Sequence, residues 1–117
     1  MSESPRHRSF ALLGSTGSVG VSTLALVARF PDRFRAVALA AGRNMAVLAE
    51  QARRHAPDLV SVADAVSAAD FRARVPEFAG RILVGPEGPL AVATHPEADL
   101  VVSALVGALG LVPTLAA

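Results

Sequence analysis

The feature that most constrains the fold of this chain is a group of glycines and hydroxyl residues between two apolar segments. Residues 11–30 read ALLGSTGSVGVSTLALVARF, in which Gly14, Gly17 and Gly20 interrupt an apolar run before apolar residues return with helical spacing. The first turn of such a helix presents unpaired backbone N–H groups and the positive end of the helix dipole. The pattern therefore predicts a turn that binds an anion such as a pyrophosphate. A glycine trio also fits a plain tight turn, in which Gly20 only allows close helix packing.

Downstream of the glycines, short apolar runs alternate with segments of helical periodicity. The expected strands are 10–14, 34–42, 58–64, 81–85 and 99–105, and the expected helices are 18–30, 44–55, 65–75 and 87–94. Asn44 is the expected cap of the second helix, and Pro57 follows its end. Because these strands are apolar on both faces, we predict an α/β fold, a Rossmann-like parallel sheet with helices on both faces.

The length of the chain favours one domain. A chain of 117 residues can bury one core and has little room for a second. We expect a flexible polar tail over 1–9 and a cofactor-binding domain over 10–117. Glycines interrupt the apolar stretch 9–28, and glycines and a proline interrupt 100–117, so neither is predicted to be a signal peptide or a membrane span. We expect a soluble, cytoplasmic protein that binds no membrane.

Composition excludes several classes of function. The net charge is +1 and aromatic residues make up 4%, which provides neither the basic stripe nor the stacking surface of a nucleic-acid binder. The chain has no cysteine, so thiolate catalysis and cysteine-ligated metals are excluded within it. All eleven basic residues are arginines, which excludes a Schiff-base lysine. Any fixed positive charge is thus a planar guanidinium, suited to phosphate.

No metal-binding or catalytic constellation is recognisable in these residues. His7, His55 and His95 fall in the tail, at a helix end and in a loop, without ligand spacing. The acids are scattered, and the serines near the glycines have no identifiable base partner. We therefore expect neither a metal site nor catalytic residues within this chain.

The segment after the second expected strand indicates which dinucleotide is bound. In a Rossmann-like fold this position faces the adenosine ribose, and an acid there would bind the 2′-hydroxyl of NAD. Gly42, Arg43 and Asn44 stand there instead. An arginine beside a helix start offers bidentate donors and a permanent charge to a 2′-phosphate, which favours NADP. Read separately, Arg43 is also consistent with a solvated turn residue and Asn44 with a plain helix cap.

Three segments occurring in order carry a resemblance to a known family. LLGSTGSVG, PDRFRAVALAAGRN and ADLVVSALVGALGLVPTLAA resemble the amino-terminal part of the 1-deoxy-D-xylulose 5-phosphate reductoisomerase family, from Phe10 onward. The resemblance implies that one group of residues holds the pyrophosphate and another lies at the 2′-phosphate. The first group is Thr16, Gly17, Ser18 and Val19, and the second is Gly42, Arg43 and Asn44. Many relatives have lysine at position 43, which keeps the charge. Residues 103–110 match a stretch near the cofactor.

The resemblance also implies an activity for the parent protein. Such an enzyme uses NADPH to rearrange and reduce 1-deoxy-D-xylulose 5-phosphate to 2-C-methyl-D-erythritol 4-phosphate in non-mevalonate isoprenoid biosynthesis. It needs magnesium or manganese. We expect the ligands of this metal ion and the catalytic groups to lie outside this chain. We expect the full-length enzyme to be a homodimer acting on a phosphosugar, and this segment alone to be inactive. Two alternatives are the cofactor domain of an NADP-linked semialdehyde dehydrogenase and a non-enzymatic NADP-binding module.

Overall fold

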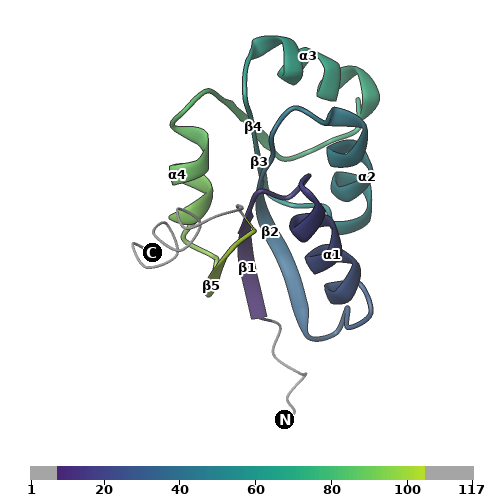
Figure 1. Ribbon diagram of the computed structural model, residues 1–117, viewed down its shortest axis with the longest axis vertical. Coiled ribbons are helices and arrows are strands. Elements are labelled where there is room, and N and C mark those ends of the chain that lie inside the picture. The colour runs from purple at the N-terminus through teal and green to yellow at the C-terminus, as the bar shows by residue number, and fades with distance from the viewer. Residues whose placement is uncertain (1–7, 105–117) are drawn as a thin grey trace.

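Five parallel strands form one sheet in the order β4-β3-β2-β1-β5 in the computed structural model, which describes residues 8–104 (Figure 1). The strands are β1 (Arg8–Leu13), β2 (Phe34–Ala40), β3 (Leu59–Val62), β4 (Arg81–Val84) and β5 (Leu100–Ser103). The helices are α1 (Ser18–Val27), α2 (Met45–His55), α3 (Ala65–Arg74) and α4 (Gly88–Ala93). Every strand and helix expected from the sequence is present among these residues, in the expected order.

The ends of some elements differ from the expected ranges. β1 begins at Arg8, which pairs with Phe34 of β2, so Arg8 and Ser9 belong to the sheet and not to the polar tail assigned to 1–9. α1 ends at Val27 instead of at residue 30, because the chain tightens into a turn before Pro31, in which the N–H of Phe30 bonds the oxygen of Val27. Residue 105, the expected end of the last strand, lies outside the described residues.

The two faces of the sheet bury alternate residues of each strand. Phe10 and Leu12 of β1 pack in the cluster under α1, α2 and α3, whereas Ala11 and Leu13 pack in the cluster under α4. The pairing of β1 with β2 shifts after Phe10, so that Val37 is an extra residue in β2. Figure 1 shows α1, α2 and α3 together on one side of the sheet and α4 on the other, as the α/β prediction requires.

The direction of the chain through the sheet reverses once. Strands β2, β3 and β4 are added outward on one side of β1, after which the chain crosses back and adds β5 on the other side of β1. Because parallel crossovers are right-handed, this reversal moves α4 to the opposite face. Ligands of doubly wound sheets bind at such a switch point, outside the carboxyl ends of the strands. Here that place is the end of β1 beside β2 and β5.

Candidate cofactor-binding site

The glycine loop begins where β1 ends and is held against the end of β2. The N–H groups of Gly14 and Ser15 both donate to the carbonyl oxygen of Ala40, at 2.9 and 3.0 Å. Gly14 has a φ of 78°, a left-handed conformation that glycine adopts without strain. A Cβ atom on Gly20 would collide with the carbonyl oxygen of Gly14. The first and last glycines are thus explained by the turn and by the packing of α1 against it.

The N-terminus of α1 is open, unlike those of the next two helices. Asn44 Oδ1 accepts a bond from the N–H of Val47 to cap α2, and Asp64 Oδ1 accepts one from Ser67 to cap α3. The cap position of α1 is Gly17, which has no side chain to do this. Within residues 8–104, no hydrogen bond uses the backbone N–H groups of Thr16, Ser18 and Val19. These donors and the helix dipole suit an anion.

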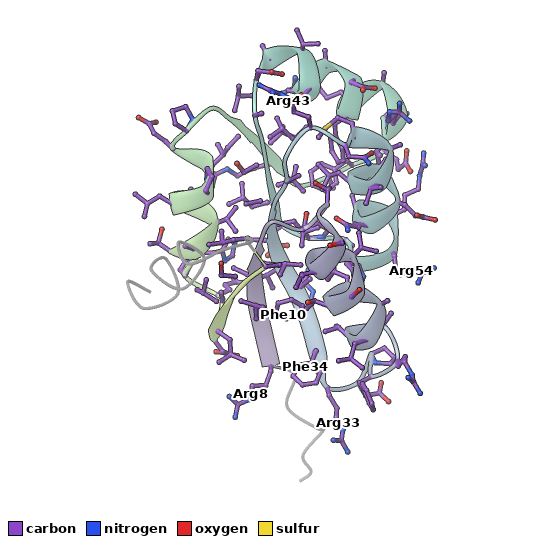
Figure 2. All side chains as sticks on the ribbon, viewed as in Figure 1. Arg8, Phe10, Arg33, Phe34, Arg43 and Arg54 are labelled. Carbon is purple, nitrogen blue, oxygen red and sulfur yellow. The ribbon has the colours of Figure 1, made fainter. Side chains whose placement is uncertain are left out.

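The second predicted segment lies beside this loop. The backbone N–H of Gly42 donates to Thr16 Oγ1 at 3.2 Å, so the ends of β1 and β2 bring together residues 26 positions apart in the sequence. The Arg43 side chain is 79% exposed, and its Nε lies 3.7 Å from Asp64 Oδ2 at the end of β3. Figure 2 places Arg43 at the opposite end of the molecule from Arg8 and Arg33. All seven predicted residues therefore lie at the carboxyl end of the sheet.

Asp64 is charged and only loosely paired with Arg43. Its pKa lies below the usual value, mainly because its carboxylate accepts a hydrogen bond from the backbone of Ser67, with a smaller effect from the Arg43 guanidinium. An ion pair at 3.7 Å between exposed groups is weak. Arg43 can consequently exchange this carboxylate for a stronger bidentate phosphate contact.

Of the two interpretations of Asn44, the structure supports the helix cap for its Oδ1 atom.

The space around Gly17 and Gly42 shows whether the fold itself requires glycine at these positions. Neither Gly17 nor Gly42 has a positive φ, so the backbone at these positions would accept another residue. A Cβ on Gly17 would lie 3.7 Å from the oxygen of Gly14, and one on Gly42 would lie 3.7 Å from Thr16 Oγ1, both ordinary contacts. The fold itself therefore does not require glycine at either position. A ligand that lies close to the backbone would require glycine at both positions. The two glycines are therefore consistent with a dinucleotide phosphate bound at this site.

Two hydroxyl groups near the switch point add to its polar character. Ser15 is fully buried, and Ser103 pairs in register with Leu13 at the end of β5. Neither Oγ atom has a hydrogen-bond partner among the described residues. Ser103 is the first residue of the predicted stretch 103–110, of which 105–110 lie outside the described residues.

A separate cavity of about 420 Å³ lies between the ends of α1 and α2, lined by residues that include Arg35, Arg54 and His55. Arg35 is already paired with Asp58 at 3.3 Å. The carboxyl ends of both helices point their negative dipoles here, which disfavours an anion. This cavity therefore does not compete with the glycine loop as a phosphate site.

A family model provides the observation that identifies the chain. The model of 1-deoxy-D-xylulose 5-phosphate reductoisomerase matches residues 10–117. The chain belongs to this family. Its Rossmann-like fold and its resemblance to reductoisomerases are thereby confirmed, and the semialdehyde dehydrogenase alternative is not supported.

Relatives and solved structures agree with this assignment. The chain is 52% identical over 114 residues to the reductoisomerase of Symbiobacterium thermophilum, covering 94% of this chain and 30% of that protein. The Zymomonas mobilis reductoisomerase in complex with NADPH superposes with a TM-score of 0.82 at 33% identity, covering 95% of this chain and 29% of that one. A reductoisomerase in complex with NADPH, fosmidomycin and magnesium gives a TM-score of 0.78 at 35% identity, covering 89% and 26%. The chain thus spans less than a third of the reductoisomerases that it matches.

The structure also locates the remaining predicted groups. His55 ends α2, and Nδ1 of His95 accepts a bond from the N–H of Glu97, whereas His7 lies outside the described residues. Within 8–104, no three histidines, cysteines or acids cluster as metal ligands would. In that same part of the chain, no helix has the length and apolar character to cross a membrane.

Sequence reasoning did not identify Gln51 or Asp64, which contact the two loops from outside them. Gln51 could have been found as a polar residue on the apolar face of α2, since it lies three positions after Leu48 and beside Ala52. Asp64 carries the signature of a helix cap, which gives no indication of its proximity to Arg43.

Proposed function

We propose that this segment binds NADPH at the carboxyl ends of β1 and β2. Thr16, Gly17, Ser18 and Val19 hold the pyrophosphate, and Gly42, Arg43 and Asn44 surround the adenosine 2′-phosphate. The observation that carries the proposal is the contact between the two loops through Thr16 and Gly42, which places an uncapped helix N-terminus beside an exposed arginine. The NADPH complex of the Zymomonas mobilis relative supports it.

The contribution of these residues is binding and orientation. The backbone N–H groups of Thr16, Ser18 and Val19 donate to phosphate oxygens, and the Arg43 guanidinium neutralises the 2′-phosphate. Bound NADPH supplies a hydride. We assign no catalytic residue to this segment. The magnesium or manganese ion of the whole enzyme would be held by ligands outside it.

For the whole protein we propose the reaction of its family, the NADPH-dependent rearrangement and reduction of 1-deoxy-D-xylulose 5-phosphate to 2-C-methyl-D-erythritol 4-phosphate in isoprenoid biosynthesis. The assignment rests on the family match over residues 10–117 and on the relatives. A phosphosugar is the corresponding substrate. A homodimer located in the cytoplasm stays a prediction for the full-length enzyme.

The test is a fluorescence titration of this chain with NADPH and NADH. We expect tighter binding of NADPH, and equal affinities would contradict the assignment of the 2′-phosphate site. In parallel, residues 10–117 would replace the matching segment of the Symbiobacterium thermophilum enzyme. The chimera should reduce the ketose phosphate with NADPH, whereas this chain alone should not. An inactive but folded chimera would contradict the proposed role in the whole enzyme.

A further inference from the structure

The side chain of Gln51 joins the middle of α2 to the glycine loop. Gln51 is 8% exposed and lies on the buried face of α2, next to Ala52 and one turn from Leu48. Its Nε2 donates to the carbonyl oxygen of Ser15 at 2.7 Å, in a buried hydrogen bond between residues 36 positions apart. This bond attaches α2 to the loop independently of the contact between Thr16 and Gly42.

The bond fixes the direction of one peptide group. The carbonyl of Ser15 and the N–H of Thr16 belong to the same peptide unit, and the described residues contain no cis peptide bond. In a trans peptide these two groups point in opposite directions. Because the carbonyl points towards the buried amide of Gln51, the N–H of Thr16 points away from it. That N–H has no partner among residues 8–104, as a donor to a ligand would require.

From this geometry we infer that Gln51 is a positioning residue for the phosphate loop, an inference that rests on the proposed binding of NADPH. Gln51 holds the Ser15–Thr16 peptide so that its N–H, and not its carbonyl oxygen, faces the phosphate. The N–H of Ser15 is held by the carbonyl oxygen of Ala40, so the bond from Gln51 fixes the next peptide group along the loop. Fixing the peptide before the ligand arrives lowers the entropy that binding must overcome.

A role in packing alone does not explain a glutamine at this position. The Oε1 atom of Gln51 is buried without a hydrogen-bond partner in the described part of the chain. Burying an unpaired amide oxygen costs free energy that an apolar side chain of similar size avoids. An apolar side chain would lack the Nε2 donor of Gln51, which bonds the carbonyl oxygen of Ser15 in the loop.

The test compares Gln51→Met, which keeps the approximate volume of the side chain and removes the donor, with Glu50→Gln, an exposed control on the same helix. Affinities for NADPH and for 2′-AMP are measured by NMR titration of this chain. For Gln51→Met we expect NADPH binding to weaken about 10-fold, which corresponds to about 1.4 kcal/mol. Binding of 2′-AMP, which has no pyrophosphate, should stay within about twofold of wild type. Glu50→Gln should change neither.

Two outcomes of this titration would overturn the inference. Unchanged NADPH affinity in Gln51→Met would show that the bond does not position the loop, and equal losses for both ligands would show a general loosening of the fold. Wild-type protein that binds neither ligand would instead contradict the proposed function, and the inference would fall with it.

A measurement on the wild type covers the case in which Gln51→Met does not fold. The side-chain amide protons of Gln51 should exchange slowly with solvent, and the Thr16 amide resonance should shift when NADP⁺ is added. Rapid exchange of the Gln51 amide, or a Thr16 amide that does not respond to bound NADP⁺, would overturn the inference.

Discussion

The hydroxyl oxygen of Thr16 accepts a hydrogen bond from the backbone N–H of Gly42 at 3.2 Å. This bond joins the loop after β1 to the loop after β2, which are the two segments assigned to the pyrophosphate and to the 2′-phosphate. The bond therefore holds the two loops next to each other, because the Thr16 side chain belongs to the first loop and contacts the backbone of the second.

Removing this hydroxyl should weaken NADPH binding with little change in the fold. Thr16→Val keeps the branched shape and leaves the N–H of Gly42 without its acceptor. The expected loss is about 1 kcal/mol, or about fivefold in NADPH affinity, by fluorescence titration. Thr16→Ser keeps the hydroxyl and should bind nearly as well as wild type. If the two variants weaken binding equally, the methyl group and not the hydrogen bond is responsible.

Reversing the charge at Arg43 should change the preference between cofactors. Arg43→Glu replaces a charge-assisted contact with repulsion of the 2′-phosphate, at a cost of roughly 2–4 kcal/mol, or about 30- to 1000-fold in NADPH affinity. NADH should lose far less, because it has no 2′-phosphate. Arg54→Glu makes the same change of charge at the far end of α2, as Figure 2 shows, and serves as the control. Equal losses of NADPH and NADH affinity in Arg43→Glu would mean that Arg43 supports the loop without binding the phosphate.

Alanine at two of the loop glycines should separate folding from binding. Gly20→Ala places a methyl group against the backbone of Gly14 and should lower the free energy of unfolding by about 1–3 kcal/mol. Gly17→Ala meets only an ordinary contact, so stability should stay within about 0.5 kcal/mol of wild type. NADPH affinity should nevertheless fall in Gly17→Ala, because the methyl group occupies the approach to the backbone. Urea unfolding and NADPH titration of both variants measure these effects, and unchanged affinity in Gly17→Ala would contradict the placement of the pyrophosphate.

Stability should depend on pH through His55. Burial lowers the pKa of this imidazole below its usual value of 6.5, and the nearby Arg54 guanidinium lowers it further. Arg35 also lines the cavity that His55 borders, and Glu50 lines a second groove between α1 and α2 that His55 also borders. Since the unfolded chain binds the proton more readily, this contribution to stability is complete above the unfolded pKa and is lost as the pH falls through 6.5 towards the folded pKa.

The variant His55→Gln should remove that part of the pH dependence. Urea unfolding at about pH 7.5 and about pH 5.5 should show a smaller difference in the free energy of unfolding for the variant than for wild type. Identical differences in the two proteins would show that the His55 proton is not linked to folding.

The sequence predicted the order and type of every strand and helix in the described residues, because the apolar period changes clearly between successive segments. The ends were less accurate where hydrogen bonds to distant residues decide them. β1 includes Arg8 because its backbone pairs with Phe34. β2 ends at Ala40 instead of at residue 42, and the N–H groups of Gly14 and Ser15 both bond the carbonyl oxygen of Ala40 there. Such pairings join residues far apart in the chain and leave no local periodicity.

The sequence by itself determined the glycine turn, the cap at Asn44 and an arginine placed after a strand, because spacing and residue type specify these features locally. Only the tertiary structure decided that β5 lies beside β1, that Gly42 bonds Thr16, that Asp64 lies near Arg43 and that Gln51 reaches Ser15. The physical reason is that each of these contacts depends on which strands are neighbours in the sheet and on where a helix lies over it. The packing of the whole core sets both, and no short segment of the sequence encodes them.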